Sequence, residues 1–433
     1  MANRVTLYMW RAARLAAKGR RDRNDGRMLI GAYYGGIELH RDDKILYARF
    51  LARHRVISTC PSAGGMRNDL DYLYNHQSCE PAGHDRSIHR LISKDPDAYR
   101  RIVCERYQLP ENRCATLGTA ANMRYAAIKD AHFRDLTVVA VCTGGVETNA
   151  GRAGDPAAVY EWNGTFEKVS GDEHVLHGTI NTLLFINHEL TPGAMVRAVI
   201  TATEAKTAAL QELAVSSRYS DGLATGTGTD QIGVAARLST AVVLTGAGKH
   251  CVLGELIGKT VHDAVIETLK LQNALTPDAQ RSTVRHLERF GCTRDLLTDQ
   301  VSQYLTEAEA ALFRRNFSVI ERDPQTVAAI AALVHIRDKV TWGILPGGCV
   351  PEFWASYGAQ VASAVSGNYE RMSAYRSVLA AAGYSASNTD LLRLVGHAIA
   401  LGFHDKWPEP ITEMREVKHP LKAGIKAQKG IEF

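Results

Sequence analysis

Residues 178–213, GTINTLLFINHELTPGAMVRAVITATEAKTAALQEL, decide the fold class of this 433-residue chain. The first ten residues are mostly apolar, which is typical of a buried strand, and from Pro192 to Leu213 the pattern becomes helical. Small side chains recur along one stripe of this helix, at Ala198, Ala202, Ala205, Ala209 and Leu213. Because such a stripe allows close approach to a sheet, we expect a layered α/β domain.

The same alternation of strand and helix extends from about residue 29 to 254. Further strands are predicted at 45–50, 56–59, 136–142, 182–186, 232–236 and 240–245, and further helices at 115–132 and 253–272. Beyond residue 272 the pattern is helical, at 279–290, 307–315, 326–340, 353–364 and 389–401. We therefore predict an α/β domain over 1–272 and a mainly α-helical domain over 273–433 that ends in a basic tail.

Composition excludes several classes of protein. The 51 basic and 46 acidic residues give a formal charge of +5 and are scattered, so a nucleic-acid partner is not expected. The sequence contains neither an apolar run long enough to span a membrane nor the apolar core of a signal peptide, and we expect a cytoplasmic protein. The eight cysteines show no C-x-x-C spacing, which favours reduced thiols over a thiolate zinc site.

A Gly/Thr-rich loop, ATGTGTD at 224–230, follows the small-residue helix and leads into a predicted strand. Its glycines allow backbone N–H groups to approach a ligand, while Thr225, Thr227 and Thr229 add hydroxyls and Asp230 adds a carboxylate. It matches neither a Walker motif nor G-x-G-x-x-G, so a nucleotide site is not indicated. An oxyanion site and a simple turn both remain consistent with the sequence.

Polar residues also mark the predicted strands and the helix. Asn181 lies within an apolar strand, where asparagine is disfavoured unless its side chain has a partner. A second glycine-rich loop, at 142–156, follows the strand at 136–142 and carries Arg152 and Asp155, which are close enough in sequence for a local ion pair. On the helix, Glu204 and Lys206 are about 200° apart and cannot pair with each other.

Six segments in this order resemble the adenosylcobinamide amidohydrolases of corrinoid salvage, over roughly residues 30–272. They are GGMRNDL with YNHQ (64–77), GVETNAGRAGDP (145–156), GTINTLLFIN (178–187), GAMVRAVITATEAKTAALQEL (193–213), ATGTGTDQI (224–232) and GKHCVLGELIGKTVHDAV (248–265). The resemblance implies hydrolysis of the amide between a corrin propionyl group and aminopropanol, which gives cobyric acid. The residues that match the family motifs are Asn75, Asn149, Arg152, Asp155, Asn181, Glu204, Lys206, Thr207, Thr225, Thr229, Asp230, Lys249, His250 and Glu255.

Amide hydrolysis needs an activated water, donors for the oxyanion and a proton for the leaving amine. We assign the water to Glu204 or Asp230, the oxyanion to the loop at 225–229 and the amine proton to Lys206 or His250, with Asn181 as an orienting amide. The remaining matched polar residues, with Thr227, are predicted to bind the substrate: Asn75, Asn149, Arg152, Asp155, Thr207, Thr225, Thr227, Thr229 and Lys249. This interpretation requires the carboxylates at 204 and 230 to share one concave surface.

Alternatives stay open at this point. Thr207 or Thr229 would serve as a covalent nucleophile, and His174 with His177 would be weak candidates for metal ligands. No cofactor is required if a corrinoid is the substrate. A related hydrolase of another amide, a corrinoid-binding protein without catalysis and a homo-oligomer are each compatible with the sequence.

Overall fold

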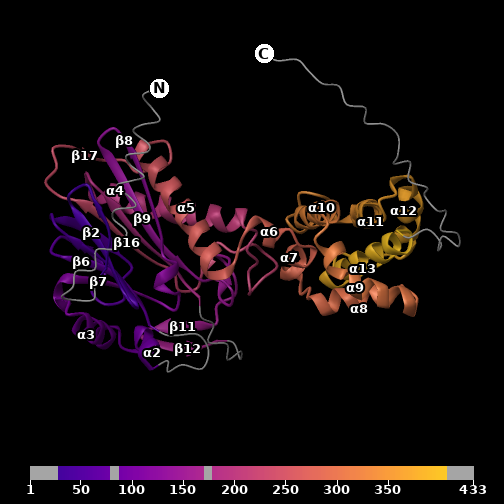
Figure 1. Cartoon of the computed structure of the whole chain (residues 1–433), viewed down its shortest axis with the longest axis horizontal. Coiled ribbons are helices and arrows are strands. Elements are labelled where there is room, and N and C mark those ends of the chain that lie inside the picture. Colours follow the sequence, from indigo (N-terminus) through magenta and orange to yellow (C-terminus); the bar gives the residue numbers. More distant parts are fainter. Residues whose placement is uncertain (1–27, 79–86, 170–177, 407–433) are drawn as a thin grey trace, which may run out of the picture. The chain divides into compact units, whose positions relative to one another are not determined.

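The computed structural model describes residues 28–78, 87–169 and 178–406. The chain divides into two compact units, Met1–Cys292 and Thr293–Phe433 (Figure 1). The first unit contains the strands and two long helices, and the described part of the second unit is helical. The prediction of an α/β domain followed by a mainly helical part is confirmed.

Two large sheets form the centre of the first unit. One has the order β1-β2-β3-β6-β7, with only β6 and β7 parallel, and consists of β1 (Met28–Tyr33), β2 (Ile37–Asp42), β3 (Ile45–Phe50), β6 (Tyr72–Gln77) and β7 (Cys114–Thr119). The other has the order β5-β4-β16-β13-β9-β8, with only β13 and β16 parallel, and consists of β5 (Gly65–Arg67), β4 (His54–Ser58), β16 (Gln231–Arg237), β13 (Ile180–Ile186), β9 (Leu136–Gly144) and β8 (Ala127–Phe133). Below we call them the first and second sheet.

The sheets pack face to face, and helices cover their outer faces. Apolar side chains of both sheets, among them Leu73 and Leu183, form one buried cluster. The outer face of the first sheet packs against α2 (Ser87–Lys94) and α3 (Pro96–Tyr107). The outer face of the second sheet packs against α4 (Pro192–Glu212) and α5 (Val252–Asn273). The unit is therefore a layered helix, sheet, sheet, helix arrangement.

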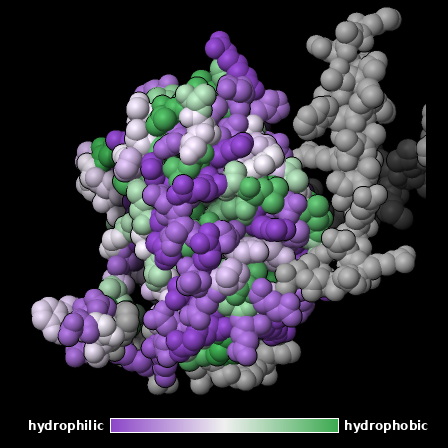
Figure 2. Space-filling model, turned by 90° about the vertical axis from the view of Figure 1, so that its left-hand side faces the viewer, coloured by the Kyte–Doolittle hydropathy of each residue, from purple (hydrophilic) through white to green (hydrophobic). Residues whose placement is uncertain are grey.

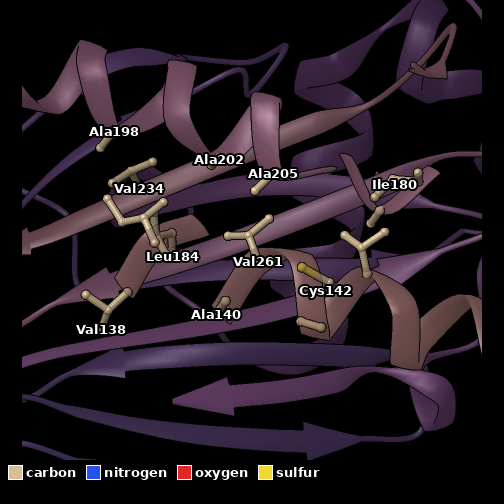
Figure 3. Close-up of a cluster of buried hydrophobic side chains, with 14 of the residues drawn as sticks. Val138, Ala140, Cys142, Ile180, Leu184, Ala198, Ala202, Ala205, Val234 and Val261 are labelled. Carbon is tan, nitrogen blue, oxygen red and sulfur yellow. The ribbon is translucent and has the colours of Figure 1, made fainter. Parts of the chain in front are cut away.

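The small-residue stripe of α4 lies in the cluster beneath this helix, as the periodicity predicts. Ala198 and Ala209 are fully buried, and Ala202 and Ala205 nearly so. Figure 3 shows Ala198, Ala202 and Ala205 beside strand side chains that include Leu184 and Val234. Because these side chains are short, the α4 backbone can lie close to the sheet, and the helix begins at a Thr191 cap followed by Pro192.

The helix predicted at 115–132 is wrong. This segment contains the fully buried strand β7, a 3-10 turn over Met123–Tyr125 and strand β8. Its alanines favour a helix locally, but β7 pairs along its length with β6 and buries every side chain, and tertiary packing overrides propensity. The strand predicted at 240–245 is shorter than expected, because only β17 (Val243–Leu244) pairs there, with β14 (Glu189–Leu190).

The remaining elements complete both units. In the first unit they are β10 (Ala150–Gly151) paired with β15 (Gly226–Thr227), β11 (Val159–Trp162) paired with β12 (Thr165–Lys168), α6 (Pro277–Gln280), α7 (Thr283–Leu287) and three 3-10 turns, Glu111–Arg113, Met123–Tyr125 and Glu288–Phe290. The second unit contains α8 (Arg294–Ser302), α9 (Glu307–Glu321), α10 (Pro324–Thr341), α11 (Val350–Ser366), α12 (Met372–Ala381), α13 (Asn388–His404) and the 3-10 turns Gly347–Cys349 and Tyr369–Arg371. Among the described residues no helix combines the length and apolarity needed to cross a membrane. The side of the molecule seen in Figure 2 is mainly hydrophilic, with scattered hydrophobic patches.

Candidate functional site

The motif loops meet at one edge of the second sheet. β13 and β16 are parallel and both begin there, and the antiparallel β9 ends there, with Ile180 opposite Gly144. The loops at 145–151, 178–179 and 224–230 are therefore neighbours, and the short pairing of β10 with β15 ties two of them together. This edge collects residues that are far apart in sequence.

Asp230 lies at the centre of this edge and accepts hydrogen bonds on both carboxylate oxygens. Oδ1 accepts from the Ile180 N–H at 2.8 Å and from Oγ1 of Thr227 at 2.6 Å. Oδ2 accepts from the Thr227 N–H at 3.0 Å and forms an ion pair with Nζ of Lys206. The side chains of Lys206 and Asp230 are only 14% and 15% exposed. We call Lys206, Thr227 and Asp230 the Lys206–Asp230 cluster.

Gly226 lies directly against this cluster, and a larger residue there would displace the ion pair. A Cβ at this position would collide with the Asp230 carboxylate and lie 2.8 Å from Nζ of Lys206, closer than carbon and nitrogen can approach. The glycine therefore lets the loop backbone lie directly against the ion pair.

The other threonines brace the loop. Oγ1 of Thr207 donates to the Thr225 carbonyl at 3.1 Å, and Oγ1 of Thr225 accepts from the Ala153 N–H at 2.9 Å. Oγ1 of Thr229 lies 2.6 Å from Oγ1 of Thr179 and donates to the Gly178 carbonyl at 2.9 Å. The hydroxyls of Thr207 and Thr229, which we considered as nucleophiles, are thus bonded to backbone carbonyls, and Thr229 is exposed.

Asn149 and Asp155 occupy the neighbouring loop. Nδ2 of Asn149 donates to the Gly178 carbonyl at 2.9 Å, and its Oδ1 accepts from the Tyr219 hydroxyl at 2.7 Å. Oδ2 of Asp155 accepts from the Arg152 N–H at 2.7 Å and from Oγ of Ser217 at 2.6 Å. Burial alone would raise the pKa of the Asp155 carboxyl, but these hydrogen bonds and the Arg152 charge outweigh it and lower the pKa. Arg152 itself is exposed.

Asn75 and Asn181 lie between the two sheets instead of at the surface. Both are fully buried, Nδ2 of Asn181 donates to Oδ1 of Asn75 at 2.8 Å, and Nδ2 of Asn75 donates to Oγ1 of Thr143 at 2.7 Å. Nδ2 of Asn181 also donates to the Gly118 carbonyl of β7. These amides join the sheets and, through the adjacent Ile180 N–H, support the backbone that holds Asp230.

Glu204 has a different environment from Asp230. It is half exposed and forms a 3.2 Å ion pair with the exposed Lys249. The neighbouring His250 is exposed, and Glu255 pairs with Lys259 on the surface of α5. The two charges of α4 that we predicted to point apart therefore bind different partners, Glu204 to Lys249 and Lys206 to Asp230.

A cavity of about 160 Å³ is lined in part by Val146 and Glu147, which belong to the loop that carries Asn149, and by no residue of the Lys206–Asp230 cluster. Arg218 is one of the lining residues, and its Nε donates a hydrogen bond to the Glu147 carbonyl. Glu288 forms ion pairs with both Arg218 and Arg285. The cavity lining comes from three segments, 146–147, 214–218 and 273–288. Sequence reasoning missed this cavity, and also Ser217 and Tyr219, because no motif marks those positions.

Metal ligation at His174 and His177 falls outside the described residues. Within the described ranges, no group of three His, Cys, Asp or Glu side chains is arranged to hold a metal ion. Seven cysteines in the same ranges form no disulfide, and most of them are buried.

Comparison with known proteins gives two matches. The family model described as adenosylcobinamide amidohydrolase matches residues 31–277, more than half of the chain. An uncharacterised protein of Methanocaldococcus jannaschii is 36% identical over 241 residues, which cover 54% of this chain and 89% of that protein. The family match includes the edge of the second sheet that carries Asp230, and it ends at Pro277, where α6 begins.

Proposed function

Because this chain belongs to the adenosylcobinamide amidohydrolase family, we propose that it hydrolyses the amide between the corrin propionyl group of adenosylcobinamide and aminopropanol. The products are an adenosylated cobyric acid and the free amino alcohol. The observation that carries this proposal is the Lys206–Asp230 cluster, where a carboxylate and an ammonium lie against a Gly/Thr loop inside the matched region. These are the groups that hydrolysis of an unactivated amide needs.

The environment of the two candidate carboxylates favours Asp230 over Glu204 as the reacting group. Asp230 is mostly buried and positioned by four donors, whereas Glu204 is half exposed and held only by an exposed lysine. Exposed ion pairs contribute little and fix their partners poorly. In our assignment Glu204, Lys249 and His250 form an outer surface that is not needed for the chemical step.

The hydrogen bonds of Asp230 also constrain the mechanism. A carboxylate offers about four acceptor sites, and all four are engaged here, by Ile180, Thr227 twice and Lys206. Asp230 can therefore accept a proton from water only when one donor leaves. We assign that movement to Lys206, whose ammonium shifts from Asp230 to the carbonyl oxygen of the bound amide as negative charge develops there.

Hydrolysis then proceeds in two steps, attack by water and release of the amine. The oxygen of water forms a bond to the amide carbon while its proton passes to Asp230, and Lys206 with loop N–H groups at 225–229 stabilises the oxyanion. The carbon–nitrogen bond then breaks, and the proton on Asp230 passes to the amine nitrogen. The role of Asn149, Arg152 and Asp155 in this scheme is to bind the substrate beside the cluster.

Incubation of the full chain with adenosylcobinamide, followed by mass spectrometry of cobyric acid and aminopropanol, tests this function. Asp230→Asn and Lys206→Met should each lower kcat by about 10²–10⁴-fold, the usual contribution of acid–base groups. Glu204→Gln is the matched control and should stay within about threefold of wild type. Wild-type turnover in both Asp230→Asn and Lys206→Met would contradict the assignment of these residues. If the wild-type chain binds the corrinoid but releases no aminopropanol, the protein is a binding protein.

A further inference from the structure

The β11–β12 hairpin is inserted between two segments of the candidate site. The chain leaves the site after Asp155, forms Val159–Trp162 and Thr165–Lys168, and returns at Gly178, whose carbonyl is bonded to Asn149. The two strands pair only with each other among the described residues. The hairpin is thus attached to the site without being part of either large sheet.

One face of this hairpin is aromatic. Residues directly opposite in an antiparallel pair share a face, and Tyr160 pairs with Glu167 and Trp162 with Thr165. Tyr160 and Trp162 therefore lie on the same face. Their rings are nearly parallel, with centroids 6.2 Å apart and planes 14° apart, and the residues are 49% and 69% exposed. Val159 and Glu161 belong to the opposite face.

The two rings stack on each other, but about half or more of each side chain stays exposed to solvent. Aromatic side chains contribute to stability mainly when they are buried, and a single two-stranded hairpin has no core of its own. An adjacent pair of exposed rings beside a candidate site is instead a typical stacking surface for a flat ligand.

The size of the proposed substrate indicates which ligand this is. Sites that enclose drug-sized molecules measure about 300–1,000 Å³, and the cavity lined by Val146 and Glu147, at about 160 Å³, is too small for a corrinoid. That cavity therefore does not enclose the substrate, and we place the bulk of the corrinoid on open surface. A corrin ring carries side chains and axial ligands on both faces, whereas the adenine of an adenosyl group is flat and stacks freely.

We propose that the Tyr160–Trp162 face binds the adenine of the adenosyl group, and so makes the site selective for adenosylated corrinoids. This inference rests on the proposed function for the identity of the substrate. The hairpin then acts as a specificity element, and the chemical step stays with the Lys206–Asp230 cluster.

Binding of two corrinoids that lack the scissile amide tests the proposal. The full chain is titrated by equilibrium dialysis with adenosylcobyric acid, which contains adenine, and with dicyanocobyric acid, which does not. Base stacking on one aromatic side chain contributes about 1–3 kcal/mol, so Trp162→Ala should weaken binding of the adenosylated ligand by about 5–150-fold. Binding of dicyanocobyric acid should be unchanged, and Trp162→Phe should stay within about threefold of wild type for both ligands.

Two control variants separate stacking from disruption of the hairpin. Val159→Ala removes an exposed apolar side chain from the opposite face of the hairpin, and Trp342→Ala removes a 56% exposed tryptophan of the second unit. Both should leave both affinities unchanged. An equal loss for the two ligands in Trp162→Ala, no loss at all, or no binding by the wild-type chain would each overturn the proposal.

The binding experiment and the hydrolysis assay can fail separately. If adenosylcobinamide is hydrolysed with an unchanged KM in Trp162→Ala, the proposed function stands and the stacking surface does not. If adenine-dependent binding is lost in that variant while the wild-type chain releases no aminopropanol, the stacking surface stands and the hydrolysis does not.

Discussion

Replacing Asp230 by asparagine gives the most direct test of the site geometry, apart from any activity. The side chain keeps its shape, but one acceptor oxygen becomes an NH₂ group. In either orientation of the amide, two of the four present donors face hydrogen atoms instead of an acceptor. If Oδ1 keeps its partners, the Thr227 N–H and the Lys206 ammonium lose theirs.

The magnitude follows from the type and burial of these two bonds. Both lost bonds end on the Asp230 carboxylate, and a hydrogen bond to a charged group contributes about 1.5–3 kcal/mol. Lys206 is 14% exposed, so the unpaired ammonium gains little from water where it lies. We expect the free energy of unfolding to fall by about 3–6 kcal/mol in Asp230→Asn. The same change at the half-exposed Glu204 removes a surface ion pair, whose contribution is about 0–1 kcal/mol.

Urea denaturation at pH 7 of wild type, Asp230→Asn and Glu204→Gln measures this difference. The two variants make the same carboxylate-to-amide change, so the difference in their free energies of unfolding reports the burial and bonding of each carboxylate. A loss below about 0.5 kcal/mol in Asp230→Asn, or equal losses in both variants, would show that the cluster is not held as described.

Further predictions concern packing, pH and metals. Ala202→Leu should destabilise the protein by about 1–3 kcal/mol in urea denaturation because the α4 stripe has no room for a larger side chain, whereas Ile200→Ala on the exposed side of the helix should cost less than about 1 kcal/mol. Burial lowers the pKa of His54 to about 4 and of His76 to about 3, whereas unfolded histidine titrates near 6.5. As the pH falls, the unfolded chain therefore binds protons before the folded chain does. The free energy of unfolding should fall by up to about 1.4 kcal/mol per pH unit for each histidine as pH drops from about 6.5 toward 4. His54→Gln should make this pH dependence shallower by about 1.4 kcal/mol per pH unit, the contribution of one proton. His174 and His177, which we considered as metal ligands, are tested by elemental analysis of the purified protein and by measuring turnover after treatment with a chelator. We expect the chelator to cause no loss of turnover.

Periodicity predicted the elements whose environment is uniform along their length. α4 and α5 each bury one stripe against the same sheet, and the predicted limits, 192–213 and 253–272, agree with Pro192–Glu212 and Val252–Asn273. The segment at 115–132 could not be predicted in this way, because β7 is buried on both faces and has no alternation to detect. Its alanines then dominated the local signal.

The site was predictable in composition and less so in geometry. The motifs identified Asn181 and Asp230, but the sequence could not tell that the asparagine would lie between two sheets and the aspartate at their edge. Those positions depend on pairing between strands that are far apart in the chain. Tyr219 and Ser217, which bond to Asn149 and Asp155, belong to a loop without any periodic or motif signal.

The helical phase of α4 links these two levels of prediction. Because 204 and 206 are about 200° apart, only one of the two charges can face the loop at 224–230, and the buried alanine stripe determines which one. Lys206 lies near the edge of that stripe and reaches Asp230, whereas Glu204 points outward to Lys249. The site therefore presents a lysine from the helix and a carboxylate from the loop, and a mechanism with two cooperating carboxylates would require a different phase of this helix.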